Sequence, residues 1–181
     1  MSFDALVEHL RRHALLTDGP YTLRSGKVAS WYVDARRTTL DGEGAGLVGR
    51  AVLEVLDPKA AAVGGMTMGA DPIAVATALI ASERGRSLRA FSIRKEEKTH
   101  GTGGRLVGPV EAGDAVTILE DTTTTGGAVF EAVEVARGEG LEVLQVVVLV
   151  DRSKGLAEEK AVSLGVPFVA LTSPEDLGMV E

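Results

Sequence analysis

The sequence predicts an α/β fold in which a mainly parallel sheet is flanked by helices and carries a small N-terminal hood. From about residue 43 onward, short apolar runs alternate with segments of helical periodicity, which is typical of βαβ units. The apolar run at residues 143–150 has no polar alternation after Gln145, as expected for a strand buried on both faces. The length of 181 residues suits one domain. We therefore expect a single domain over residues 1–181, with residues 1–40 contributing the hood.

The N-terminal segment does not follow the strand–helix alternation of the remainder. Leucine and alanine residues at helical spacing predict a helix over residues 2–16. Residues 21–23 and 31–33 are rich in aromatic and β-branched side chains, which predicts two short strands. Ser25 and Gly26 provide the expected turn between these strands.

The rest of the chain alternates strands with helices. The expected strands are residues 60–63, 88–93, 115–119, 143–150 and 168–171. The expected helices are residues 43–56, 73–81, 128–136 and 156–164. Asp71 followed by Pro72 predicts a capped start for the second of these helices. Residues 95–108 lack periodicity, and long loops in compact domains are usually functional.

Composition limits the class of protein. The net charge of −7 argues against a protein whose main partner is nucleic acid. The absence of cysteine excludes a disulfide framework and a cysteine-ligated metal. Charged residues occur too early for a signal peptide, and the longest apolar run is too short to span a bilayer. We expect a cytoplasmic protein with no membrane partner.

The most informative segment runs from an apolar strand through two acids, four threonines and two glycines into a helix. Its residues are Glu120, Asp121, Thr122, Thr123, Thr124, Thr125, Gly126, Gly127 and Ala128. At the carboxyl edge of a parallel sheet, such a helix start forms a cradle for phosphate. A carboxylate aimed at phosphate would repel it, so Glu120 and Asp121 are better suited to the hydroxyls of a ribose. The segment predicts a ribose-5-phosphate site; a strand end with an Asp/Thr helix cap is the simpler alternative.

A second segment, directly after the strand at residues 88–93, gathers cations beside several glycines. Its cationic residues and histidine are Arg94, Lys95, Lys98 and His100. Cations of this kind stabilise the negative charge that develops on a departing pyrophosphate. A loop that contains glycines can also close over a site and exclude water. A solvated surface loop is the alternative, because charge runs usually are solvated.

The first segment, with its acids, threonines and Gly-Gly, resembles the signature for 5-phosphoribosyl-1-pyrophosphate (PRPP) in type I phosphoribosyltransferases. The resemblance covers nearly the whole chain and implies the fold of that family, a parallel sheet flanked by helices with a variable hood. The spacing Arg-Lys-x-x-Lys-x-His-Gly resembles the catalytic loop of orotate phosphoribosyltransferases. It implies that Arg94, Lys95, Lys98 and His100 bind PRPP, with Lys98 as the main catalytic cation and His100 as a catalytic candidate. It also implies a homodimer in which the loop serves the neighbouring subunit.

Three further segments, two in the hood and one loop, resemble other parts of this family. Those around Arg24 and Tyr32 resemble the hood that covers the base, which implies that Arg24 contacts PRPP and that Tyr32 lies against the orotate ring. A core aromatic is an equally good interpretation of Tyr32. The segment Gly-Gly-Met-Thr-Met-Gly-Ala-Asp-Pro resembles the pyrophosphate loop, but Thr67 and Met68 stand where some members have an aromatic residue and a lysine.

Arg152 follows the long buried strand and therefore lies at the expected ligand edge of the sheet. Arginine binds carboxylates with paired hydrogen bonds, and orotate has a carboxylate where uracil, adenine and hypoxanthine have none. The resemblance assigns both Arg152 and Thr124 to orotate. A surface ion pair of Arg152 with Asp151 or Glu158 is the alternative.

Together these features imply transfer of the phosphoribosyl group of PRPP to orotate, giving orotidine 5′-phosphate and pyrophosphate in pyrimidine biosynthesis. Mg²⁺ is the expected cofactor, held mainly through PRPP, because the sequence shows no cluster of metal-ligating side chains. The alternatives are a phosphoribosyltransferase for another base and a PRPP-binding regulator of the same fold. Arg152 and the Lys98-x-His100 spacing argue against the first, and the acidic charge argues against the second.

Overall fold

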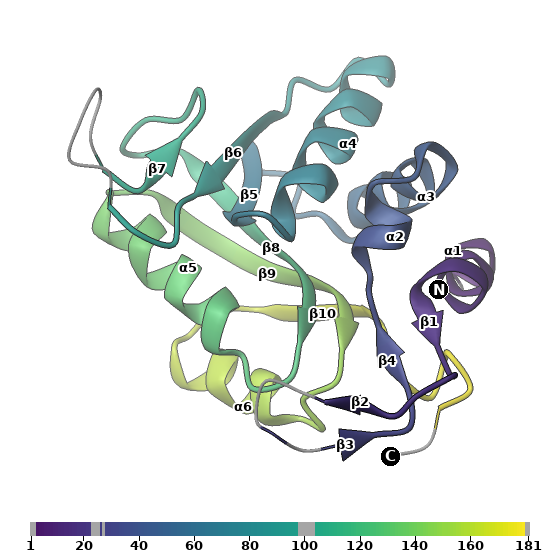
Figure 1. The fold of residues 1–181 in the computed structure, drawn as a ribbon. Helices are drawn as coiled ribbons and strands as arrows, with labels where there is room; N and C mark the ends of the chain where they lie inside the picture. The colour runs from purple at the N-terminus through teal and green to yellow at the C-terminus, as the bar shows by residue number, and fades with distance from the viewer. Residues whose placement is uncertain (1–2, 23–25, 27, 98–103, 180–181) are drawn as a thin grey trace.

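The computed structural model describes residues 3–22, 26, 28–97 and 104–179, and a six-stranded sheet forms its centre (Figure 1). The strand order is β10-β9-β8-β5-β6-β7. The strands are β5 (Ala62–Met66), β6 (Arg89–Ile93), β7 (Leu106–Val107), β8 (Ala115–Thr123), β9 (Glu142–Asp151) and β10 (Phe168–Thr172). Neighbouring strands are parallel except β6 and β7, which are antiparallel. The expected α/β class with a mainly parallel sheet is confirmed.

Helices cover both faces of this sheet (Figure 1). They are α1 (Asp4–His9), α2 (Arg36–Thr39), α3 (Gly42–Val55), α4 (Ala70–Glu83), α5 (Gly127–Gly138) and α6 (Leu156–Ser163). The helices α1, α3 and α4 pack on one face, and α5 and α6 pack on the other. Within the described residues, none of these helices has the length and apolar character that crossing a bilayer requires.

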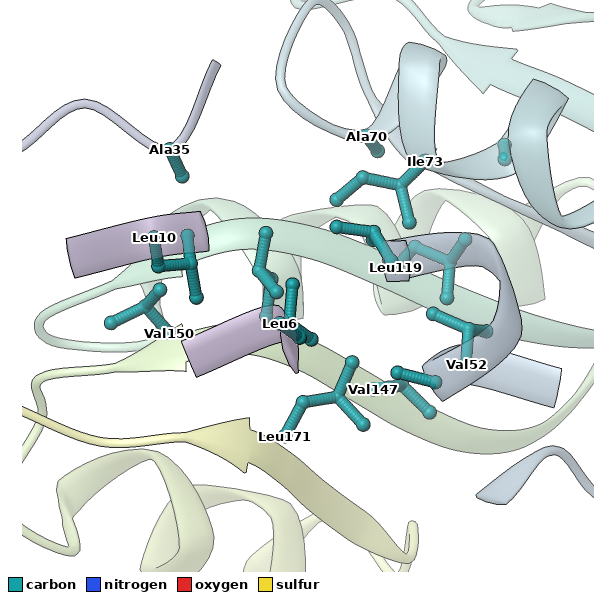
Figure 2. Close-up of a cluster of buried hydrophobic side chains, with 14 of the residues drawn as sticks. Leu6, Leu10, Ala35, Val52, Ala70, Ile73, Leu119, Val147, Val150 and Leu171 are labelled. Carbon is teal, nitrogen blue, oxygen red and sulfur yellow. The ribbon is translucent and has the colours of Figure 1, made fainter. Parts of the chain in front are cut away.

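Two apolar cores lie on the two faces. On the first, Val52 and Ile73 of the helices meet Leu119 and Val147 of the central strands, as Figure 2 shows. On the second, Phe130 of α5 packs with Ile118 of β8 and the buried valines of β8 and β9. The central strands are therefore covered on both sides, which explains why the strand at residues 143–150 lacks polar alternation.

The N-terminal segment forms two small antiparallel pairs of strands. β1 (Leu15–Leu16) pairs with β4 (Tyr32–Val33), and β2 (Tyr21–Thr22) pairs with β3 (Val28–Ala29). The predicted turn at Ser25 and Gly26 falls between β2 and β3 in the chain, and Ser25 lies outside the described residues. The second predicted strand, at residues 31–33, pairs with β1 rather than with the first predicted strand. A physical reason is that Val33 is buried in the core beside α1 and pairs there with Leu15.

The predicted helix over residues 2–16 is shorter than expected. Its regular part is α1, a π-helical turn follows at Leu10–Ala14, and Leu15 is already extended. Pairing with β4 takes the last two residues out of the helix, an interaction distant in sequence that local periodicity does not reveal.

Other boundaries also differ from the sequence expectation near the carboxyl edge of the sheet. The strand expected at residues 60–63 is β5, which begins at Ala62 and continues to Met66. β8 continues past Leu119 to Thr123, because Glu120 and Thr122 pair with Val148 and Val150 of the long strand β9. The helix α4 begins at Ala70, and Asp71 is not its cap. β7 was missed because two residues are too few to show alternation.

Candidate active site

A cavity of about 990 Å³ opens at the carboxyl ends of β5, β6, β8 and β9. Parallel sheets bind ligands at this edge because the loops that follow neighbouring strands converge there. Residues of the hood line the cavity opposite these strand ends: Tyr21, Thr22, Tyr32, Val33, Asp34, Ala35 and Arg36. The strand-end residues include Thr67, Met68, Gly69, Lys95, Glu120, Asp121, Thr122, Thr124, Thr125, Ala128 and Arg152.

Two neighbouring carboxyl groups at the end of β8 form the buried part of this site. Glu120 is only 7% exposed, and burial, with the adjacent Asp121, raises the pKa of Glu120 to about 8, although Lys95 opposes the shift. Burial also raises the pKa of Asp121, opposed by the backbone N–H of Thr122, which donates to Asp121 Oδ1 at 2.7 Å. At neutral pH the Glu120 carboxyl is therefore mostly protonated, and a protonated carboxyl both donates and accepts hydrogen bonds. Such a group suits a ribose hydroxyl.

The turn from β8 into α5 is shaped by its own side chains. The buried Thr123 hydroxyl accepts a hydrogen bond from the backbone N–H of Gly126 at 2.9 Å. Gly126 has φ +76°, and a Cβ there would lie 2.6 Å from the Phe130 ring, so this position favours glycine. α5 then starts at Gly127 with no side-chain cap, the arrangement in which first-turn N–H groups bind anions. The members of the turn that line the cavity are Thr122, Thr124, Thr125 and Ala128.

The loop after β5 approaches the carboxyl pair closely. Asp71 accepts hydrogen bonds from Thr67 Oγ1 at 2.7 Å and from Ser92 Oγ at 2.6 Å, so it ties this loop to β6. A Cβ added to Gly69 would lie 2.6 Å from Asp121 Oδ1, which shows how near the loop passes to that carboxylate. The loop itself supplies the cavity with a hydroxyl, a thioether and backbone, and no cation.

The two cations directly after β6, Arg94 and Lys95, have different positions in the structure. Lys95 lines the cavity, whereas Arg94 does not. The guanidinium of Arg94 donates to the carbonyl of Gly104 at 3.4 Å. Arg105 donates to the Arg94 carbonyl at 2.7 Å and to Glu131 Oε1 of α5 at 2.6 Å. The two ends of this segment are therefore held together and fastened to α5.

Arg152 enters the cavity from the end of β9. Its backbone N–H donates to the Thr123 carbonyl at 2.8 Å, and its guanidinium lies over the Trp31 ring, 4.3 Å from the ring centroid. Tyr32 and Thr124 line the same cavity. The structure thus brings the three residues predicted to bind orotate to one cavity.

Sequence reasoning missed an ion pair in the hood that lines the cavity. Arg36 Nε donates to Asp34 Oδ1 at 2.9 Å. This partner raises the pKa of Arg36, and the charge of Asp121 across the cavity raises it further. A signal was present in the sequence, since the acid and the arginine follow directly on the strand that contains Tyr32.

Three predicted site residues, Arg24, Lys98 and His100, lie outside the described residues. Their roles stay predictions, as do the detailed roles of the others. Among the described residues, no group of three or more histidine or carboxylate side chains is arranged to hold a metal ion.

Named relatives are similar in sequence to this chain over nearly its full length. An orotate phosphoribosyltransferase of Streptomyces avermitilis is 46% identical over 176 residues, which cover 97% of this chain and 96% of the relative. One of Rhodopirellula baltica is 43% identical over 171 residues, covering 91% and 88%. No protein-family model matches the chain.

Solved structures agree with this result. The orotate phosphoribosyltransferase of Mycobacterium tuberculosis in complex with PRPP superposes with a TM-score of 0.82 at 35% identity, covering 98% of this chain and 99% of the other. A phosphoribosyltransferase of Corynebacterium diphtheriae gives 0.84 at 37% identity, covering 99% and 100%. The fold, a mainly parallel sheet flanked by helices, is that of a type I phosphoribosyltransferase, and the cavity lies at the carboxyl edge of this sheet. Within that class, the chain belongs to the orotate phosphoribosyltransferase family.

Proposed function

We propose that this chain transfers the phosphoribosyl group of PRPP to orotate, giving orotidine 5′-phosphate and pyrophosphate in pyrimidine biosynthesis. The observation that carries the proposal is a single cavity that joins a carboxyl pair, an uncapped helix start and an arginine. These are the groups needed for a ribose, a phosphate and a carboxylate. Membership of the family supports the same reaction.

PRPP occupies the β8 side of the cavity in this proposal. The carboxyls of Glu120 and Asp121 hold the ribose hydroxyls, and the backbone N–H groups and hydroxyls of residues 122–128 hold the 5′-phosphate. The turn suits this task because its helix start is uncapped and its shape is fixed by the bond between Thr123 and Gly126.

The chemistry requires stabilisation of a leaving group. The bond from the anomeric carbon to the pyrophosphate oxygen breaks, and its electron pair leaves with pyrophosphate. A bond to a ring nitrogen of orotate forms, and the proton of that nitrogen passes to the departing pyrophosphate or to solvent. We assign charge stabilisation to Lys95, Lys98 and His100, with Lys98 as the main catalytic cation and Arg94 as a further contact. Lys95 already lines the cavity, which supports its part of this assignment.

Orotate occupies the side of the cavity formed by the hood and the end of β9. Arg152 pairs with its carboxylate, Thr124 contacts the same ligand, and Tyr32 lies against the ring. A planar guanidinium matches the two oxygens of a carboxylate. This match gives a physical reason for a preference for orotate over bases that lack the carboxylate.

Mg²⁺ is proposed to enter with PRPP. Magnesium usually keeps several waters and binds through substrate phosphates together with one or two carboxylates. Asp121 is the fitting carboxylate here, since it lines the cavity beside the loop after β5. The cytoplasmic location expected from the sequence stays a prediction.

A homodimer is the proposed assembly, with a second copy of this chain covering an exposed apolar strip. The residues proposed to form it are Leu40, Met68, Val75 and Leu79, each at least 60% exposed. Val75 and Leu79 are one turn apart on α4, and Leu40 and Met68 line one small cavity beside the main site. Exposed apolar patches of this kind mark protein interfaces, and two-fold pairing of identical patches is the commonest solution. Contact near Met68 would bring the partner close to the active site, as sharing of the catalytic loop requires.

One assay tests the reaction. Purified protein is mixed with PRPP, Mg²⁺ and orotate, and loss of orotate is followed together with formation of orotidine 5′-phosphate and pyrophosphate. Uracil replaces orotate in a parallel reaction. We expect conversion of orotate and little conversion of uracil; equal rates with both bases, or no conversion of orotate, would contradict the proposal.

A further inference from the structure

The hood contains the sole tryptophan of the chain, and this tryptophan contacts the arginine at the end of β9. Trp31 precedes β4 and is 9% exposed, within the core on the α1 side of the sheet. It does not line the cavity, whereas Arg152 does. The tryptophan therefore lies behind the arginine as seen from the ligand space.

The geometry is that of a cation–π contact. The guanidinium carbon of Arg152 lies 4.3 Å from the Trp31 ring centroid, well inside the range of about 6 Å in which such contacts are attractive. The strand anchors the other end of the same residue, because the Arg152 backbone N–H donates to Thr123 of β8. The backbone and the guanidinium of Arg152 are thus both restrained.

Restraint of an arginine matters for the strength with which it binds a carboxylate. A free arginine side chain loses rotamer entropy when it is fixed by a ligand. A side chain held before the ligand arrives loses less, so the ligand binds more tightly.

We propose that Trp31 is a positioning residue for orotate, which holds the Arg152 guanidinium in the orientation that receives the carboxylate. The inference rests on the proposed function, because it takes orotate to be the ligand of Arg152. It assigns Trp31 no contact with orotate. Its effect is confined to the base side of the cavity and leaves the PRPP side unchanged.

The decisive experiment is a double-mutant cycle. Trp31→Leu keeps an apolar side chain in the hood but removes the aromatic face, and Trp31→Phe keeps a smaller face. We expect Trp31→Leu to raise the KM for orotate about tenfold, equivalent to about 1.4 kcal/mol, with the KM for PRPP nearly unchanged. Trp31→Phe should recover most of this loss. In an Arg152→Ala background, Trp31→Leu should add little, because the group it positions is gone.

Three outcomes would overturn the inference while leaving the proposed function intact. These are a full additional loss from Trp31→Leu in the Arg152→Ala background, equal losses for orotate and PRPP, or no loss in a folded Trp31→Leu protein. Failure of the wild type to convert orotate would instead contradict the proposed function itself. Thermal unfolding of each variant checks that it folds. If Trp31→Leu does not fold, the same cycle is run with Trp31→Phe. The same pattern is expected, with a smaller increase in the KM for orotate.

The sole tryptophan also provides a direct signal. Its emission should change on titration with orotate in the wild type, at concentrations that match the kinetic KM, because the neighbouring guanidinium acquires a partner. PRPP alone should produce a much smaller change. A larger emission change with PRPP than with orotate would place Trp31 with the residues that bind PRPP and refute the positioning role.

Discussion

Glu120→Gln is expected to alter how the stability of the protein depends on pH. The folded-state pKa of Glu120 is about 8 against an ordinary value of 4.5, chiefly because the carboxyl is buried. The unfolded chain therefore releases this proton at a lower pH than the folded chain. The stabilising contribution of the protonated group is complete below about pH 4.5 and is lost as pH rises toward about pH 8.

The size of the effect follows from these two values. One pKa unit corresponds to about 1.4 kcal/mol, so ionisation of Glu120 in the unfolded chain favours unfolding by about 3 kcal/mol at about pH 7. At about pH 5 the same effect is below about 1 kcal/mol. Glutamine resembles the protonated carboxyl in shape and does not ionise. The free energy of unfolding of Glu120→Gln relative to wild type should therefore rise by about 2–3 kcal/mol as the pH is raised from about 5 to about 7.

The difference between pH values is a better measure than the absolute stability. Glu120 Oε2 is buried without a hydrogen-bond partner among the described residues, so a glutamine amide placed there adds a constant penalty of about 1–3 kcal/mol. A constant penalty cancels in the comparison. Asp121 remains in both proteins, so most of its own titration cancels as well.

Urea unfolding of wild type and variant near pH 5 and near pH 7 makes the measurement. Glu142→Gln is the matched control, since Glu142 is exposed on the neighbouring strand β9. Its effect should stay within about 0.5 kcal/mol at both pH values. A Glu120→Gln difference that changes by less than about 0.5 kcal/mol between the two conditions would show that Glu120 ionises normally in the folded protein, and would refute the reasoning.

Three other outcomes are expected. Arg152→Ala should weaken orotate by about 2–4 kcal/mol in kcat/KM while PRPP affinity stays nearly constant; equal losses for both substrates would mean that Arg152 holds the fold. Gly69→Ala should weaken PRPP binding, measured by calorimetry, because the new methyl lies within 2.6 Å of Asp121 Oδ1, and unchanged affinity would contradict this crowding. Inactive Lys98→Ala and Asp121→Asn subunits, when mixed, should regain roughly a quarter of wild-type sites, since about half the dimers are mixed and each has one intact site. Activity that stays at the level of the parents, with exchange verified by mass, would exclude a shared loop.

The sequence predicted the order of the central elements because each carries its own apolar pattern. The run at residues 143–150 predicts a strand covered on both faces, and β9 confirms it. The boundary of β8 could not be predicted in this way. Glu120 and Asp121 have no strand propensity, and they are extended because the long apolar partner β9 continues beside them.

The hood shows the opposite limit. Its strands have two residues each, so no alternation can be measured, and their partners follow from packing between segments distant in sequence. The ion pair of Asp34 with Arg36 and the contact of Trp31 with Arg152 both depend on those pairings. The sequence motifs identified Lys95, Glu120 and Asp121 as site residues, but only the fold determines which groups meet in the cavity.

The burial of Glu120 also bears on how an acidic chain binds a polyanion. The sequence carries a net charge of −7 and places two acids next to a phosphate cradle, which on charge alone would repel PRPP. Because β8 extends to Thr123, both carboxyls sit at the end of a covered strand, and the pKa of Glu120 is raised to about 8. At neutral pH the Glu120 carboxyl adds little negative charge to the site, and Lys95 and Arg36 line the same cavity. The extension of the strand thus converts an apparent electrostatic conflict in the sequence into a site whose acids can serve neutral hydroxyls.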